Sequence, residues 1–134
     1  MATDKEFLDK FGKLLIQEVR DPSIQKWEKY VSGQMKGERA KAISSLLTSF
    51  SDEQRSVIVS FAPYIVNNVL HNLLQMLEDE EEIDITVSID GETSSTLRDI
   101  SDGLGAEIYN DEGWIVRFSE YPEIDAQAIA DVRS

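Results

Sequence analysis

The spacing of apolar residues changes near residue 80, and this change constrains the fold more than any other feature. Before it, apolar side chains recur every three or four residues, which is typical of amphipathic helices. After it, Ile83, Ile85, Val87 and Ile89 alternate with polar residues, which predicts a strand with one buried face. We therefore predict an α+β fold, with a four-helix region over residues 1–79 and a small antiparallel sheet with short helical turns over residues 80–134.

Four helices are expected in the first region, over residues 5–19, 22–32, 38–50 and 52–77. Pro22 should end the first helix, because the residue before a proline is disfavoured in helical geometry. Ser51 and Gln54 form a capping-box pattern at the start of the fourth helix. Pro63 should kink this helix near residues 59–62. Its apolar stripe is wide, which indicates a helix covered on more than one side.

The second region is expected to hold turns and short strands. Asp90-Gly91 is a turn signal between extended segments. Residues 97–104 suggest one or two helical turns, and residues 108–118 suggest a hairpin around a turn at 110–113. The apolar pattern of residues 114–121 fits either a strand or a helix, and strand is favoured. Pro122 can begin a final short helix, or the tail frays.

Length and composition indicate one domain over residues 1–134. The second region alone would make a marginal domain, so one core shared by both regions is expected. The chain contains no cysteine, which fits a reducing cytoplasm, and its first residues lack the apolar stretch of a secretory signal. Polar residues interrupt the most apolar window, residues 57–77, so we expect a core helix there and no membrane span.

Charge is distributed very unevenly along the chain. Residues 1–75 carry ten Lys/Arg and nine Asp/Glu, whereas residues 76–134 carry three and seventeen, a balance of −14. Such a field repels nucleic acid and anionic membranes and attracts basic proteins. We therefore expect a basic protein partner, and no nucleic acid or membrane partner. The residues expected to bind it are carboxylates and aromatic anchors: Glu80, Glu81, Glu82, Tyr109, Asp111, Glu112, Trp114 and Tyr121. For Trp114, core packing is the stronger interpretation.

The sequence contains no motif that assigns a catalytic residue, a cofactor or a metal ion. His71 is the only histidine, and none of the glycines completes a calcium-binding loop. One alternative is a polar stripe at helical spacing that could line a ligand groove, with His71 as a proton-transfer group: Tyr64, Asn67, Asn68, His71 and Gln75. The simpler interpretation is the solvated face of an amphipathic helix. Whether the protein is an enzyme stays open, and the missing motifs favour a binding protein.

A few short segments resemble parts of uncharacterised small acidic bacterial proteins with helical N-termini. They are Ile100-Ser101-Asp102-Gly103-Leu104, Asp111-Glu112-Gly113-Trp114-Ile115 and Tyr121-Pro122. In size, acidity and α+β pattern the chain is also similar to immunity proteins that neutralise bacterial toxins. This resemblance implies a small acidic protein-binding module, in concrete form an immunity or antitoxin-like inhibitor. A ligand-binding or enzymatic domain around His71 and a structural helical homo-oligomer are the alternatives.

Overall fold

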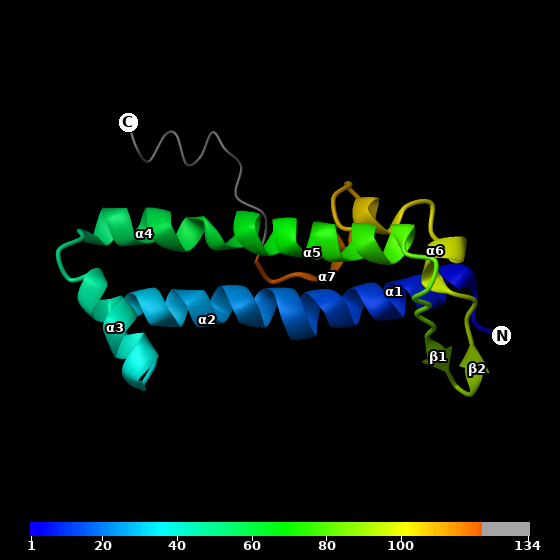
Figure 1. Cartoon of the computed structure of the whole chain (residues 1–134), viewed down its shortest axis with the longest axis horizontal. Coiled ribbons are helices and arrows are strands. Elements are labelled where there is room, and N and C mark those ends of the chain that lie inside the picture. The colour runs from blue at the N-terminus through cyan, green and yellow to red at the C-terminus, as the bar shows by residue number, and fades with distance from the viewer. Residues whose placement is uncertain (122–134) are drawn as a thin grey trace.

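Two long helical arms lie side by side and run in opposite directions along the molecule (Figure 1). The computed structural model describes residues 1–121, so the segment predicted from Pro122 onward lies outside the described residues. The first arm consists of α1 (Asp4–Leu14), the π-helical segment η1 (Leu15–Arg20) and α2 (Asp21–Ser32). The second arm consists of α4 (Asp52–Ser60) and α5 (Ala62–Asp79), and α3 (Glu38–Leu46) connects the two arms at one end.

The first arm runs through Pro22 without a break, so the prediction that a helix ends there is wrong. The wider turns of η1 precede the proline, and the amide of Asp21 bonds to the carbonyl of Ile16, five residues earlier. A π turn relieves the clash between a proline ring and the preceding turn, and it tolerates the missing amide donor. Pro22 itself stands in the first turn of α2, where no intrahelical donor is needed.

Several predicted helix ends are confirmed. Gly33 ends α2 in the left-handed conformation, with φ of 78°. Ser51 and Gln54 exchange both bonds of a capping box at the start of α4. The predicted kink is also confirmed, because α4 ends at Ser60 and α5 begins at Ala62, just before Pro63. This kink divides the predicted fourth helix, so residues 1–79 hold five α-helices where four were expected.

The predicted α+β class is confirmed by a two-stranded antiparallel sheet, although the strand is much shorter than expected. Strand β1 (Ser88–Ile89) pairs with β2 (Glu92–Thr93) across the predicted Asp90-Gly91 turn. Ahead of β1 the two segments stay paired through mixed bonds. The amides of Val87 and Ile85 donate to Ser94 Oγ at 2.9 Å and to Thr96 Oγ1 at 3.3 Å, while the carbonyls of Val87 and Ile85 accept from the backbone amides of Ser94 and Leu97. The alternation of half-buried and exposed residues nevertheless continues from Asp84 to Asp90.

The predicted hairpin over residues 108–118 is wrong. Its second strand is replaced by the helix α7 (Trp114–Phe118). The helical turns predicted over residues 97–104 are confirmed by α6 (Leu97–Ile100) and the 3-10 turn η2 (Leu104–Ala106). Helix α7 places Trp114 against Gly12 of α1, and a Cβ atom on Gly12 would lie only 2.3 Å from the indole ring. Since Trp114 is 1% exposed, helical geometry at 114–118 buries the largest side chain of the segment in the core.

One hydrophobic cluster contains residues from both regions of the chain. Leu8, Leu15, Ile16, Leu70, Leu74 and Leu77 come from the two arms, and Leu97, Leu104, Ile108, Trp114 and Ile115 come from the later segment. Residues 97–115 therefore fill the space between the arms.

The second arm is also unusually apolar. The 28 residues Asp52–Asp79 are long and apolar enough to cross a membrane, a criterion that core helices of soluble proteins also meet. Only 28% of the most apolar window is buried within the described protein, so much of this helix is exposed.

Candidate partner-binding site

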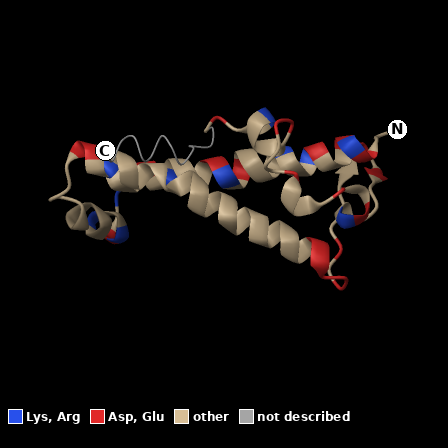
Figure 2. Cartoon of the chain, turned by 90° about the horizontal axis from the view of Figure 1, so that it is seen from above, with Lys and Arg blue, Asp and Glu red and all other residues tan. Residues whose placement is uncertain are grey.

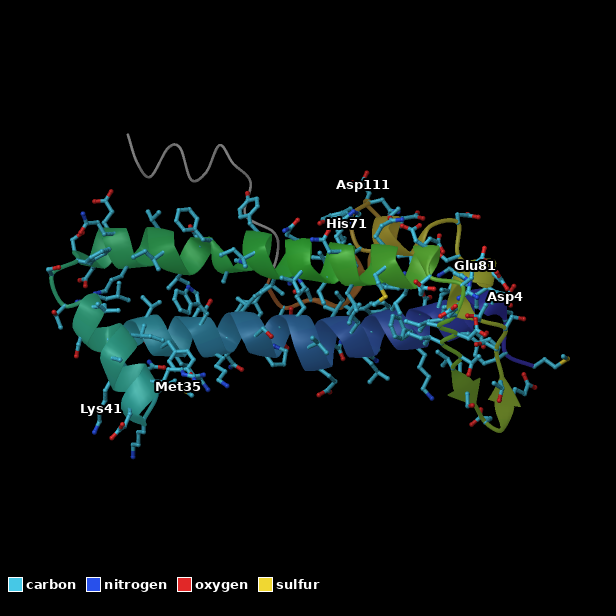
Figure 3. All side chains as sticks on the ribbon, in the orientation of Figure 1. Asp4, Met35, Lys41, His71, Glu81 and Asp111 are labelled. Carbon is cyan, nitrogen blue, oxygen red and sulfur yellow. The ribbon has the colours of Figure 1, made fainter. Side chains whose placement is uncertain are left out.

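The fold converts the charge asymmetry of the sequence into an asymmetry along the long axis of the molecule. Acidic residues gather where α5 ends and, with Lys5 among them, where α1 begins, whereas the opposite end carries Lys and Arg in α3 together with a few acidic residues of α3 and α4 (Figure 2). Figure 3 shows Asp4 and Glu81 at the first end and Lys41 at the second. The antiparallel arms thus add the acidic start of α1 to the acidic residues that follow α5.

Arg98 holds the acidic connector, residues 80–84, in place. Its guanidinium donates to the backbone carbonyls of Glu80, Glu81 and Ile83, and its Nη2 lies 2.6 Å from Asp84 Oδ1. The positive charge therefore sits beside the carbonyls that follow the C-terminus of α5, where the helix dipole favours a cation. The side chains of Glu80, Glu81 and Glu82 stay exposed to solvent.

An acidic cleft of about 690 Å³ lies between α1, α6 and the segment that leads into α7. We define it by its lining residues: Lys5, Leu8, Asp9, Ile100, Asp102, Glu107, Asn110, Glu112 and Arg117. Arg117 closes one side, because its Nη2 lies 2.8 Å from Asp9 Oδ1 and its Nε donates to the carbonyl of Glu112 at 2.7 Å. Lys5 also pairs with Asp9, at 2.9 Å. Four carboxylates thus face two cations around one opening.

The carboxylates of the acidic cleft differ in their protonation chemistry. The hydrogen bond from Arg117 holds the pKa of Asp9 below its ordinary value. Burial raises the pKa of Glu107, and the nearby charge of Asp102 adds to this effect, while a hydrogen bond with Ser101 opposes it. The cleft therefore contains one carboxylate held in an ion pair, Asp9, and one whose charged form burial disfavours, Glu107.

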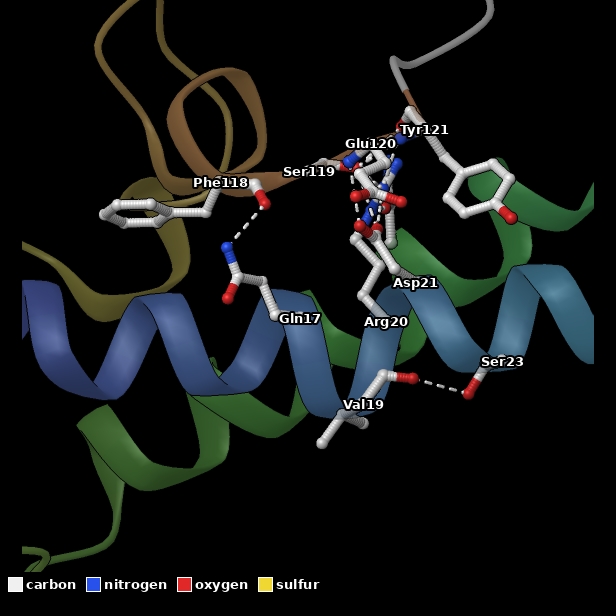
Figure 4. Close-up of polar contacts among 10 residues, drawn as sticks. Gln17, Val19, Arg20, Asp21, Ser23, Phe118, Ser119, Glu120 and Tyr121 are labelled. Atoms are coloured by element: carbon white, nitrogen blue, oxygen red, sulfur yellow. Dashed lines mark hydrogen bonds and ion pairs between the residues drawn. The ribbon is translucent and has the colours of Figure 1, made fainter.

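A buried polar junction centred on Arg20 anchors the end of the described chain (Figure 4). The Arg20 side chain is inaccessible to solvent; its Nε donates to Asn67 Oδ1 at 2.7 Å, and its Nη1 lies 3.0 Å from Asp21 Oδ1. The same Nη1 donates to Ser119 Oγ at 2.7 Å and to the carbonyl of Tyr121 at 2.9 Å. This junction joins both arms to residues 119–121, which follow α7.

The predicted partner-binding residues are spread over the surface and do not form one cavity. Among them, Glu112 lines the acidic cleft, and Glu80, Glu81 and Glu82 lie at the end of α5. Asp111 is exposed and Tyr109 is 45% exposed, so both can reach a partner. Tyr121 is half-buried beside the Arg20 junction. Trp114 belongs to the core and does not offer its ring to a partner.

The alternative ligand groove is present only in part. His71 and Gln75 line an open depression of about 550 Å³ together with Glu78, Tyr109 and the glycines of the η2 turn. His71 Nδ1 lies 3.1 Å from the carbonyl of Gly105, and its ring centre is 5.5 Å from that of Tyr109. Asn67 does not belong to this groove, because it is 2% exposed and accepts from Arg20. Tyr64 is half-buried and Asn68 is exposed, and neither lines the depression.

Most of the acidic cleft could not be anticipated from the sequence. Asp9 and Arg117 are separated by 108 positions, and no local pattern links them. Lys5, Asp102 and Glu107 likewise carry no signal beyond their charge. Within residues 1–121, no group of three or more His, Cys, Asp or Glu side chains has the geometry to hold a metal ion.

The comparisons with known proteins give no relative of this chain. No protein-family model matches it, and neither a curated protein nor a solved structure shows significant similarity to it.

Proposed function

We propose that this protein is a small acidic protein-binding module that binds a basic segment of its partner in the acidic cleft. The observation that carries this proposal is the half-buried carboxyl of Glu107, which shares the cleft with Asp102 and Glu112. A Lys or Arg side chain that enters the cleft would find three carboxylates in one opening.

The cleft also suits the shape of a long basic side chain. Leu8 and Ile100 contribute apolar lining on which the methylene groups of a Lys or Arg can pack while the charged end reaches the carboxylates. The exposed carboxylates at the end of α5 would act at longer range, by raising the rate at which a basic partner approaches. Tyr109, which is 45% exposed, would serve as an aromatic anchor for the partner.

Specifically, this module would act as an immunity or antitoxin-like inhibitor in the cytoplasm. Such an inhibitor would act by covering a basic surface that a toxin needs for its activity. The same negative field opposes binding to DNA, RNA and anionic lipid, because these ligands are held largely through contacts between phosphates and cations.

The test compares two variants with the same change in charge. The cleft variant carries Asp102→Asn, Glu107→Gln and Glu112→Gln, and the control carries Glu38→Gln, Asp52→Asn and Glu53→Gln, which are exposed at the opposite end. Each is titrated with an arginine-rich peptide and with a peptide of the same length in which Gln replaces Arg. We expect the cleft variant to lose about tenfold in affinity for the basic peptide, and the control to lose much less.

Two results would contradict the proposal. Equal losses in the two variants would mean that net charge acts alone, without the cleft. Binding of the Gln peptide as tightly as the basic peptide would exclude recognition of positive charge. Once a partner is isolated from the native cell, the same two variants test whether the association rate falls and whether the defect shrinks as ionic strength rises.

A second candidate function is binding of a small polar ligand in the depression beside His71. The supporting observation is the convergence of His71, Gln75, Glu78 and Tyr109 around one opening. The test is a screen of small polar metabolites by ligand-induced thermal stabilisation, with His71→Ala and Asn72→Ala compared. A hit that the first variant loses and the second keeps would support this function, and a hit retained by both would contradict it.

A further inference from the structure

An exposed apolar stripe runs along α5 on the side that faces away from the core. Its side chains are spaced three or four residues apart and therefore share one helix face. They are Phe61, Ile65, Val69, Leu73 and Met76, which are 38%, 63%, 60%, 39% and 43% exposed. The buried residues Leu70, Leu74 and Leu77 each follow a stripe residue directly and occupy the neighbouring face, so the apolar surface of α5 extends beyond the face that packs in the core.

The apolar stripe is also free of charge along its whole length. Residues 56–77 contain no Asp, Glu, Lys or Arg. A solvated helix face normally carries such residues, and monomeric proteins rarely expose a continuous apolar surface of this kind. Since the described residues 1–121 leave these five side chains exposed, the stripe favours an occupant from outside these residues.

The two ends of the molecule carry opposite charges, and this selects the occupant. Between residues 22 and 55 there are six Lys/Arg and four Asp/Glu, a balance of +2, and Lys36, Arg39 and Lys41 are exposed in and around α3. At the far end of α5, residues 78–84 contain six Asp/Glu and no Lys or Arg. Figure 2 shows α3 and the acidic end of α5 at opposite ends of the molecule, with the uncharged length of α5 between them.

We propose that two copies of this chain pack α5 against α5 in antiparallel fashion around a two-fold axis. A two-fold interface brings the same surface of both copies together, so the apolar stripe buries itself. Reversal of one copy places the basic α3 end of each beside the acidic end of the other. A parallel pairing would instead bring two acidic ends together.

The antiparallel arrangement also fixes a register. The stripe runs from Phe61 to Met76, so its midpoint lies at Val69 and the axis passes there. Val69 then faces Val69 of the second copy, and Ile65 faces Leu73 of the second copy. With a rise of about 1.5 Å per residue, two Ile65 side chains are displaced by roughly 12 Å along the helices.

A lipid bilayer fits the stripe less well than a second copy does. The neighbouring face of α5 already packs on the core, and the acidic residues that follow α5 are repelled by anionic lipid. The proposal does not depend on the acidic cleft, because the residues that it uses and the residues that line the cleft do not overlap.

The chain has no native cysteine, so single introduced cysteines report the register directly. A disulfide requires Cα atoms within about 7 Å. Under mild oxidation, Val69→Cys should form a covalent dimer, whereas Ile65→Cys and Leu73→Cys should each stay uncrosslinked when alone and should crosslink when mixed. Self-crosslinking of Ile65→Cys together with failure of Val69→Cys would overturn the register and the proposal.

Two aspartate variants test the surface without crosslinking. Val69→Asp places two carboxylates at the axis and should raise the dimer dissociation constant at least about a hundredfold. Val116→Asp is the matched control, because Val116 is 65% exposed on α7 and lies outside the stripe. Sedimentation equilibrium of the full chain measures both. Equal dissociation constants for the two variants would overturn the proposal.

Charge reversal tests the antiparallel arrangement. Arg39→Glu with Lys41→Glu should weaken the dimer about tenfold, and Glu80→Lys with Glu81→Lys should do the same. A mixture of the two variants should dimerise like the wild type, because each reversed end then meets an end of opposite charge. Failure of this rescue would overturn the arrangement. A wild-type chain that is monomeric, or that floats with neutral phosphatidylcholine vesicles instead of self-associating, would overturn the dimer itself.

Discussion

The two arms and the segment that follows them are stabilised in different ways. The arms consist of helices whose backbone groups bond within the same element, and their ends carry caps from neighbouring residues such as Thr3 and Ser51. Residues 80–121 contain only two-residue strands and short helices. Many of their backbone groups bond to side chains that are distant in the sequence. Arg98 holds the carbonyls of the acidic connector, and the hydroxyls of Ser94 and Thr96 accept from amides ahead of β1.

This difference teaches how a short irregular segment can have a definite structure. Local bonding suffices for the arms, whereas residues 80–121 depend on particular side chains that fit particular backbone groups. Single substitutions should therefore affect the later segment through a few junctions.

The largest effect is expected at the Arg20 junction, where the two regions meet. Arg20→Met leaves the Asp21 carboxylate without its cation in a buried setting, and it should cost about 3 kcal/mol of the free energy of unfolding. Urea denaturation measures this cost. The double variant Arg20→Met with Asp21→Asn should recover part of the loss, because it leaves no uncompensated charge. A double variant less stable than the single would show that the ion pair is not the cause.

The second prediction concerns the contact between α1 and α7. Gly12→Ala would by helix propensity stabilise α1 by about 1 kcal/mol. The added Cβ, however, would lie 2.3 Å from the Trp114 ring, and we expect a net destabilisation of about 2 kcal/mol by overpacking. Thermal denaturation and the near-ultraviolet signal of Trp114 report the change. Lys13→Ala, at an exposed neighbouring position, is the control and should stay near neutral.

The third prediction tests whether the acidic connector depends on a single cation. Arg98→Ala removes the donors for three carbonyls and the ion pair with Asp84, and it should cost about 1 kcal/mol in total. The loss should be local, so hydrogen exchange should accelerate at residues 80–84 and stay unchanged in α1. Acceleration along both arms would mean that the connector is part of the same cooperative unit.

The smallest effect is expected from Glu107, and its sign depends on pH. Burial raises the pKa of Glu107 in the folded chain, so the stability that this group contributes is present below the ordinary pKa of a glutamate and is lost as pH rises through the folded-state value. Glu107→Gln should therefore be slightly more stable than the wild type at neutral pH, with no such advantage in acid. Asp9 has the opposite sign, since its lowered pKa contributes stability that is lost as pH falls. A gain from Glu107→Gln that is independent of pH would contradict this explanation.

The sequence by itself determined the features that depend on neighbouring residues. Several of these features follow from local backbone chemistry, and the structure confirms them. They are the start of α4 at Ser51, the end of α2 at Gly33, the kink before Pro63 and the turn at Asp90-Gly91. The change from helical to alternating periodicity also marks the boundary between the arms and the later segment. The uncharged length of α5 is equally visible in the sequence. Its wide apolar stripe predicts a helix covered on more than one side, whereas within residues 1–121 the face with Ile65 and Val69 stays exposed.

Only the tertiary structure decided the features that join distant residues. The helix at 114–118 replaces the predicted strand because Trp114 finds its space against Gly12, a contact across about a hundred residues that no local pattern encodes. The first arm passes through Pro22 because the π turns of η1 relieve the proline and bring Arg20 into the junction with Asn67 and Ser119. The acidic cleft exists because Asp9 and Arg117 meet across the fold. Local propensities determine where elements begin and end. Where two conformations are permitted locally, packing between elements selects the one that buries more apolar surface and leaves no buried charge unpaired.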